Sequence, residues 1–382
     1  MRYNPNIASV SSINICFQAN RTKEIKDHKN YDVSFDMNQQ AIKLMEDFIS
    51  NAYSEYYEVG NFTSKIVSTN ITDNRVEIKI MVSFEKVLKA SNISELPFIQ
   101  GMTASVKSLE RVRSTDTPIA KYILNEQITA ISEYIGEVQE ENAIFRVLSN
   151  TVNDNLANPI LEVYGVDEFI PAEYFIPQSP DELYAEGILD LERNVVSTKE
   201  AIAIVYPDLD VNKISESQIN MLQNTRAIKY DRLAARDYAN KYTSECGEGY
   251  NTTYWNKNYA WHTENEGVDC ANYVSQAIFA GGIPTDSTWK PESIAWVNTG
   301  KNDSGGLAPY MTGKGYFKKV TRSTCAAGGF ISHTDFSHVI FVVANDTVIM
   351  QFSSHTADRL KASFAGSYYA NFNYYSINST YQ

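Results

Sequence analysis

Apolar and polar residues recur at two different periods in the N-terminal part of the chain. From Met37 to Tyr57 the apolar side chains return every three or four residues, which predicts a helix with one buried face. Residues 76–84 alternate with a period of two. Together with residues 63–69 and the polar turn Thr72-Asp73-Asn74, they predict a β-hairpin. A second helix and two further strands are expected over 122–138, 143–151 and 160–164.

The segment that follows is predicted to be helical and to end the first domain. Ser179-Pro180-Asp181-Glu182 has the residues of a helix N-terminus, with Ser as the cap, Pro directly after it and Glu two residues later. Helices are expected from there to about Asn194, over 198–204, and from Ser215 toward Tyr242. We predict an extended arm, an α+β accessory domain of cystatin-like or NTF2-like shape, a linker or helix, and a C-terminal domain, over residues 1–36, 37–205, 206–225 and 226–382.

Charge divides the chain at the same boundary. From Arg226 onward there are 14 Lys or Arg and 13 Asp or Glu, a net charge of +1, whereas residues 1–225 hold 19 and 33, a net charge of −14. The total of −13 argues against nucleic acid or an anionic membrane as the main partner. The oligomeric state is left open by the sequence.

The composition is that of a folded protein without a membrane span. Hydrophobic residues make up 43% of the chain, and no run of 18 apolar residues occurs. The first residues, MRYNPNIASV, lack the apolar core of a signal peptide. The high Tyr and Asn content and the few Cys nevertheless favour an exported protein whose leader has been removed, extracellular or attached to the cell wall. A cytoplasmic location is the alternative.

Residues suited to chemistry gather in the C-terminal part. All four Trp and four of the five His follow residue 225. Four cysteines, Cys16, Cys246, Cys270 and Cys325, lack the close spacing of a zinc ribbon, so neither a metal nor another cofactor is predicted. A disulfide between Cys246 and Cys325 stays open as an alternative to free thiols.

Cys270 is the candidate nucleophile. Apolar residues at helical spacing after it, and Gly281-Gly282 beyond them, predict a helix that begins at Cys270 with Asp269 as its N-cap. The positive end of the helix dipole should lower the pKa of this thiol below its usual value of about 8.5. The first N–H groups of the helix can hold the oxyanion formed when a carbonyl is attacked. The alternative is a small buried hydrophobic residue on an ordinary helix.

His338 is the candidate general base. It opens the β-branched, apolar run 339–344, which is typical of a buried central strand. Its ordinary pKa of about 6.5 suits acid and base work near neutral pH. Asn345-Asp346 predicts a turn, and a return strand should follow over 347–353. A third residue that orients the imidazole is expected from this strand or its end, with His355 preferred and Gln351 and Asp358 as alternatives.

Four aromatic residues precede the nucleophile in a stretch rich in Gly, Asn and Thr. Aromatic faces suit sugar or peptide ligands, so these side chains are candidates for a substrate groove. Packing against the nucleophile helix is the alternative role. The residues are Tyr250, Tyr254, Trp255 and Trp261.

Several blocks of the C-terminal part resemble the bacterial family of putative amidase domains. The most specific block is Asp269-Cys270-Ala271-Asn272-Tyr273-Val274-Ser275-Gln276, where the family usually has Thr and Phe in place of Ala271 and Tyr273. The other blocks are 230–239, Tyr250-Asn251, Gly281-Gly282, Trp289, Trp296, His338-Val339 and His355-Thr356-x-Asp358-Arg359. The resemblance covers about residues 226–365. Ile340 departs from the wider group, which often has Gly there.

The resemblance implies a fold and an activity. The family is similar to the NlpC/P60 and CHAP groups, so we expect an α+β chain with a papain-like C-terminal domain and a separate accessory region before it. It implies a cysteine-dependent hydrolase of amide bonds, acting on bacterial peptidoglycan as an amidase or stem-peptide endopeptidase, or on another peptide, without a cofactor. The rival is a non-catalytic cell-surface or spore-associated binding module on the same fold. We also expect residues 226–382 to fold alone, because the blocks and the composition change begin together.

Overall fold

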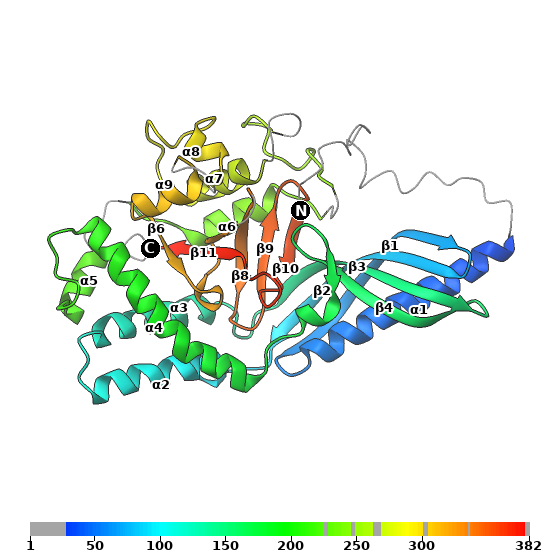
Figure 1. The fold of residues 1–382 in the computed structure, drawn as a ribbon, viewed down its shortest axis with the longest axis horizontal. Helices are drawn as coiled ribbons and strands as arrows, with labels where there is room; N and C mark the ends of the chain where they lie inside the picture. The colour runs from blue at the N-terminus through cyan, green and yellow to red at the C-terminus, as the bar shows by residue number, and fades with distance from the viewer. Residues whose placement is uncertain are drawn as a thin grey trace.

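The computed structural model describes most of the chain and is a mixed α+β protein, as the sequence predicts. The described residues are 28–224, 228–245, 249–262, 269–300, 305–334 and 337–378. Figure 1 shows the chain as a ribbon in which one twisted sheet runs through the whole molecule.

The N-terminal layer is a long helix packed on antiparallel strands. Helix α1 (His28–Tyr53) contacts β1 (Tyr57–Thr72) and β4 (Asn155–Tyr164), and β2 (Arg75–Leu88) and β3 (Gln139–Val152) lie between those two strands. The predicted hairpin is confirmed. The predicted extended arm is wrong for residues 28–36, which belong to α1, because no Pro or Gly interrupts that stretch. The rest of the arm lies outside the described residues.

Two helices inserted between β2 and β3 pack on a third. They are α2 (Pro97–Arg111), which the sequence pattern did not predict, and α3 (Thr117–Ser132), which begins five residues before the predicted helix. Helix α4 (Pro180–Val205) is one continuous helix and not two, and its N-terminus has the predicted capping box. A Cβ atom on Gly101 would lie 2.0 Å from the carbonyl oxygen of Tyr184, so α2 and α4 touch backbone to backbone.

Short elements connect these helices to the C-terminal sheet. The stretch after Ser215, predicted as one helix, contains two, α5 (Glu216–Asn224) and α6 (Arg232–Lys241). The other short elements of this part are η3 (Ile93–Glu95), β5 (Phe169–Pro171) and η4 (Ala172–Phe175).

The C-terminal strands continue the sheet in the order β10-β9-β8-β7-β11-β6. Helices α6 and α7 pack on β8 and β9. The predicted turn at Asn345-Asp346 and its return strand are confirmed. The elements are α7 (Cys270–Ala280), α8 (Ile294–Val297), α9 (Leu307–Gly313), β6 (Phe317–Val320), η5 (Arg322–Thr324), β7 (Phe330–His333), β8 (Val339–Asn345), β9 (Met350–Ser354), β10 (Arg359–Ser363) and β11 (Phe372–Ile377).

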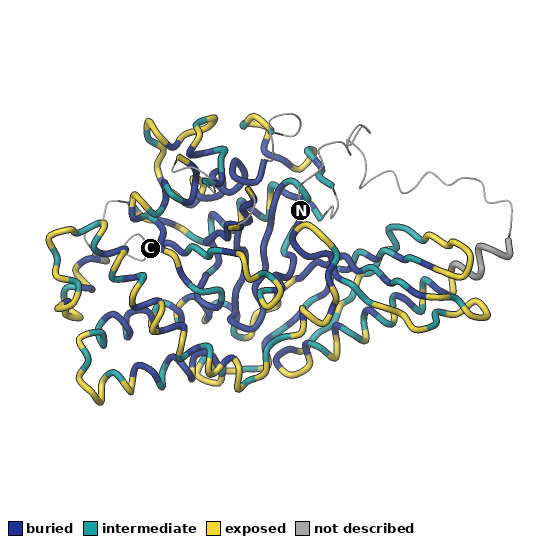
Figure 2. The backbone as a smooth tube through the Cα atoms, viewed as in Figure 1, coloured by how far each residue is buried: buried dark blue, intermediate teal, exposed yellow. Residues whose placement is uncertain are grey.

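Strand β8 is buried on both faces, as its apolar run predicts. Val339, Phe341 and Val343 belong to the core that includes α7, whereas Ile340 and Val342 belong to a second core on the opposite face. Figure 2 shows this centre as the most continuously buried part of the backbone. A strand covered on both sides is a rigid support for the residue that precedes it.

The accessory region is joined to the C-terminal region and is not detached from it. Strand β3 pairs in parallel with β10 through Asn142 and Ala362, so the two parts share one sheet. At this seam Lys86 forms a buried ion pair of 2.5 Å with Glu141. The hydroxyl group of Tyr57 donates a 2.7 Å hydrogen bond to Asp346 in the β8–β9 turn.

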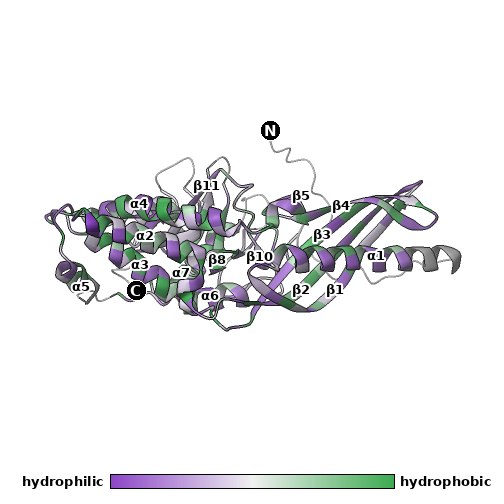
Figure 3. Cartoon of the chain, turned by 90° about the horizontal axis from the view of Figure 1, so that it is seen from below, coloured by the Kyte–Doolittle hydropathy of each residue, from purple (hydrophilic) through white to green (hydrophobic). Residues whose placement is uncertain are grey.

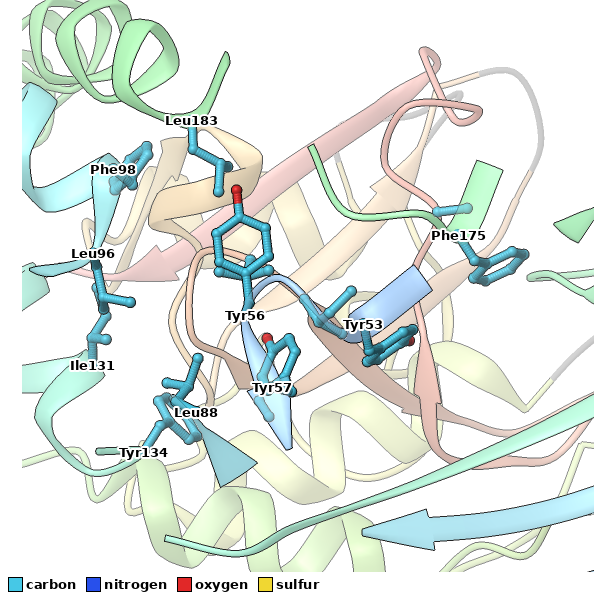
Figure 4. Close-up of a cluster of buried hydrophobic side chains, with 14 of the residues drawn as sticks. Tyr53, Tyr56, Tyr57, Leu88, Leu96, Phe98, Ile131, Tyr134, Phe175 and Leu183 are labelled. Carbon is cyan, nitrogen blue, oxygen red and sulfur yellow. The ribbon is translucent and has the colours of Figure 1, made fainter. Parts of the chain in front are cut away.

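The seam also has an apolar component. Figure 3, a view from below, shows α1 with β1–β4 at one end and α2–α5 beside the C-terminal elements at the other. Figure 4 shows the buried cluster where these parts meet, formed by Tyr53, Tyr56, Tyr57, Leu88, Leu96, Phe98, Ile131, Tyr134, Phe175 and Leu183. The same core includes Ala344, Val348, Ile349 and Ala365 of the C-terminal part, which argues against independent folding of residues 226–382.

Candidate active site

Cys270 is the first residue of α7, as predicted, and its thiol is fully buried. The backbone N–H groups of Ala271 in the same helix and of Val339 at the start of β8 are close enough to the sulfur to favour its ionised form. The sulfur therefore lies at the point where the N-terminus of α7 meets the first residue of β8. His338 directly precedes that residue.

The expectation of a lowered thiol pKa is wrong in this conformation. Burial raises the pKa of Cys270 to about 12, and the negative charge of Asp269 raises it further. The two N–H groups oppose this effect but do not outweigh it. The thiol is therefore protonated at neutral pH and needs a base at the moment of attack.

Asp269 occupies the N-cap position, but its carboxylate does not cap the helix in the usual way. One carboxylate oxygen accepts hydrogen bonds from the backbone of His262 at 3.1 Å and from the side chain of Asn272 at 2.8 Å. The other lies 2.7 Å from Nδ1 of His355. The residue before the nucleophile is thus held from three directions.

His355 supports the nucleophile helix and does not orient His338. Its Nδ1 bonds to Asp269, and its Nε2 bonds to the backbone carbonyl of Tyr242 at 2.6 Å. Both ring nitrogens are thus engaged with other partners, and neither is left for His338. The ring is stacked between Trp255 and Tyr273, at centroid distances of 4.0 and 4.1 Å. The preferred third residue is therefore corrected to a positioning residue for Asp269.

The two alternative third residues also have other partners. Gln351 donates hydrogen bonds to the backbone carbonyls of Glu140 and Lys361, at 3.0 and 3.2 Å. Asp358 accepts hydrogen bonds from Ser244, from the backbone of Asn251 and from the indole of Trp255. Burial raises the pKa of this carboxyl. Asp358 therefore anchors the segment before the nucleophile.

His338 is buried immediately before β8. Its Nε2 lies 4.0 Å from a carboxylate oxygen of Asp167. Asp167 belongs to the loop between β4 and β5, in the accessory region. The sequence reasoning missed it, because its only local signal is a Gly-Val-Asp turn after a predicted strand. We expect the Cys270 sulfur to lie within about 4 Å of a His338 ring nitrogen, and this expectation stays a prediction.

The four aromatic groove candidates differ in exposure. Trp255 is a packing residue, since it is 2% exposed and stacks on His355, so its groove role is wrong. Tyr250 packs against it at 5.5 Å between ring centroids. Tyr254 and Trp261 are 46% and 39% exposed and can contact a ligand.

Other candidate features lie away from Cys270 or do not form. Among the described residues, no group of three or more His, Cys, Asp or Glu is close enough together to hold a metal ion. Cys325 is a free, buried thiol, and Cys246 lies outside the described residues. A cleft of about 650 Å³ is lined by α4, η4 and the segment after β10, and it is separate from the nucleophile. No helix in the described part is long and apolar enough to cross a membrane.

Comparison with known proteins adds evidence for the C-terminal part. A protein of Bacillus subtilis (strain 168), described as "Uncharacterized protein YjcM", is 27% identical over 168 residues. The aligned part covers 40% of this chain and 37% of that protein, so the chain spans well under half of its relative. No solved structure matches the chain.

Residues 229–377 match the family model described as "Putative amidase domain". This range contains Cys270, His338 and the His355-Thr356-x-Asp358-Arg359 block, so the resemblance to that family is confirmed. The description of the family indicates hydrolysis of amide bonds. The C-terminal part of this chain is therefore similar to the family of putative amidase domains.

Proposed function

We propose that the protein is a cysteine-dependent amide hydrolase with Cys270 as nucleophile and His338 as general base and acid. One observation carries this proposal. The buried sulfur sits at the N-terminus of α7 and is close to the N–H of Val339, the residue directly after His338. A nucleophile, a base and backbone N–H donors thus come from two rigid elements that meet at one point.

The reaction proceeds in two acyl-transfer steps. His338 takes the proton of the Cys270 thiol as the sulfur attacks the amide carbon, because the raised thiol pKa leaves little thiolate at neutral pH. N–H groups at the start of α7 hold the resulting oxyanion. The C–N bond breaks as His338 donates its proton to the departing amine. Water, deprotonated by His338, then attacks the thioester, and its proton returns to Cys270 through His338.

Peptidoglycan is the substrate class that we favour. The exposed rings of Tyr254 and Trp261 precede the nucleophile and suit the sugar or stem-peptide faces of such a polymer. The papain-like arrangement of helix and sheet, and action outside the cell as an amidase or stem-peptide endopeptidase, are parts of this proposal.

A binding module on the same fold is the second candidate. It is favoured by the complete burial of Cys270 and its raised pKa, since buried structural cysteines are inert. The catalytic proposal requires that substrate approach exposes the sulfur. The two candidates therefore differ in what happens to Cys270 when substrate is present.

Digestion of purified peptidoglycan, followed by mass spectrometry of the fragments, tests the proposal. The wild-type chain should release fragments with new amide-cleavage ends, and Cys270→Ala should reduce the rate by about ten-thousand-fold or more. Cys325→Ala is the matched control, because that thiol is equally buried and its pKa is also raised to about 12. It should retain activity.

Two results would contradict the proposal. One is equal fragment release by Cys270→Ala and the wild-type chain. The other is binding of peptidoglycan by both proteins with no cleavage of any amide bond, which would support the binding module.

A further inference from the structure

We propose that Asp167, a residue of the accessory region, is the positioning residue of His338. Its carboxylate oxygen lies 4.0 Å from Nε2 of His338. The charge of Asp167 also acts on the Cys270 thiol, so the carboxylate is near both members of the proposed pair. The inference rests on the proposed function, in which His338 becomes positively charged.

The loop that carries Asp167 is held in a tight turn. The N–H of Gly165 donates a 2.7 Å hydrogen bond to the carbonyl of Glu168. The N–H of Val166 donates to the hydroxyl oxygen of Tyr369 at 2.6 Å, and the hydroxyl of Tyr164 donates to the carbonyl of Asp167 at 3.2 Å. Each of these bonds restricts the backbone on either side of the carboxylate.

The same loop is docked onto the C-terminal region. The buried guanidinium of Arg359 donates to the carbonyls of Tyr164, at 2.8 Å, and of Gly165. Val166 is 2% exposed and belongs to the core formed with Ile340. A Cβ atom on Gly165 would lie 1.8 Å from the hydroxyl oxygen of Tyr369, so only glycine allows this approach.

Arg359 connects the family block to this loop. The block His355-Thr356-x-Asp358-Arg359 holds Asp269 through its first two residues and the segment before the nucleophile through Asp358. Arg359, the last of the four, holds the loop of Asp167. One short block thus fixes three neighbouring parts of the site.

A carboxylate is suited to the role because the imidazolium of His338 forms during the reaction. At 4.0 Å the contact is electrostatic and not yet a hydrogen bond, and the Asp167 side chain is 41% exposed. Two carboxylates, Asp269 and Asp167, act on the Cys270 thiol. Asp269 is bonded to His355, whereas Asp167 faces Nε2 of His338.

The experiment combines kinetics on the full chain with NMR titration of His338. Asp167→Asn should lower kcat about tenfold, leave KM within about twofold, and move the NMR titration of His338 to lower pH. Asp167→Glu should recover part of the loss. Glu168→Gln is the matched control, since that carboxylate is adjacent but contacts Tyr368. Tyr369→Phe, which removes the acceptor of the Val166 N–H, should give a smaller loss of kcat.

The outcomes separate this inference from the proposed function. If the wild-type chain is active and Asp167→Asn matches it in kcat and in the His338 titration, the positioning role is overturned. If the wild-type chain cleaves nothing, the proposed function fails, but the titration still decides the contact. In that case, a His338 titration that moves to lower pH in Asp167→Asn but not in Glu168→Gln supports the contact between Asp167 and His338. An unchanged titration in Asp167→Asn rejects the contact.

Discussion

In β2 every second side chain is buried, whereas in β8 all seven are. The first strand belongs to a sheet covered by α1 on one face, and the second to a sheet covered on both. The same hydrogen-bonded sheet therefore changes from a one-sided layer into a two-sided core along its width. The accessory end can carry surface residues, and the C-terminal end can hold side chains rigidly.

Buried polar groups follow the same division. At the accessory end they concentrate at the seam, in Lys86 and Glu141. At the C-terminal end they surround the nucleophile helix, in Asp269, His355 and Asp358. Arg359 belongs to the C-terminal part and donates a hydrogen bond to the accessory region. A substitution at the seam is therefore expected to alter the geometry of the site.

Removal of the accessory region should have the largest effect. A fragment that begins near Ser215 loses the β3 partner of β10 and the two carbonyl partners of the buried Arg359. These losses are large beside a typical stability of about 5–15 kcal/mol. We expect no cooperative urea transition by circular dichroism. A soluble fragment with a sharp transition would restore the picture of two independent domains.

Loss of one buried charge at the seam should come next. Lys86→Met leaves Glu141 buried without its cation and should lower the free energy of unfolding by about 3–5 kcal/mol. Adding Glu141→Gln should recover much of this loss, since the amide still accepts hydrogen bonds from Tyr53 and Ser363. Urea denaturation of the full chain measures both.

A second, more exposed ion pair provides the control for this change. Lys361 and Glu140 form an ion pair of 2.7 Å with side chains 30% and 46% exposed. Lys361→Met should therefore cost less than about 1 kcal/mol. Equal losses in Lys86→Met and Lys361→Met would show that the seam behaves like solvent-exposed surface.

Asp190, on α4 at the other side of the seam, should give the smallest effect. Burial raises its pKa from 3.8 to about 6. The folded state then binds the proton more tightly than the unfolded state, so its contribution to stability is full below about pH 4 and is lost as pH rises through about 6. Asp190→Asn should flatten this decline and raise stability at pH 7 by about 1–3 kcal/mol.

Urea denaturation at several pH values from 4 to 7 measures this change. Asp210→Asn is the control, because that carboxylate is on the surface and its pKa is lowered by the side chain of Lys213. If the free energy of unfolding of the wild-type chain does not fall over this range, then ionisation of Asp190 does not destabilise the folded state.

The local features of the fold could be predicted from the sequence. The hairpin around Asp73 and the cap at Ser179 depend on residues a few positions apart, so their patterns are visible in the chain. Cys270 at a helix start and His338 before a strand are local in the same sense.

The rest of the site depends on contacts between distant segments. Asp269 was expected to cap its own helix, but the buried ring of His355 lies close enough to take one carboxylate oxygen. Helix position alone predicted a lowered thiol pKa, and burial reverses it. The approach of Asp167 to His338 requires the docked accessory loop, which no spacing along the chain indicates.

The place of β11 in the sheet sets the order in which the chain can fold. This strand, the last one described, inserts between β7 and β6 and pairs with both. A growing chain emerges from the ribosome N-terminus first. The N-terminal layer of α1 and β1–β4 can therefore form while the later strands are still being made. The sheet around β8 cannot close until residues 372–377 have left the exit tunnel. The sheet next to Cys270 thus gains its final geometry only after translation of that strand.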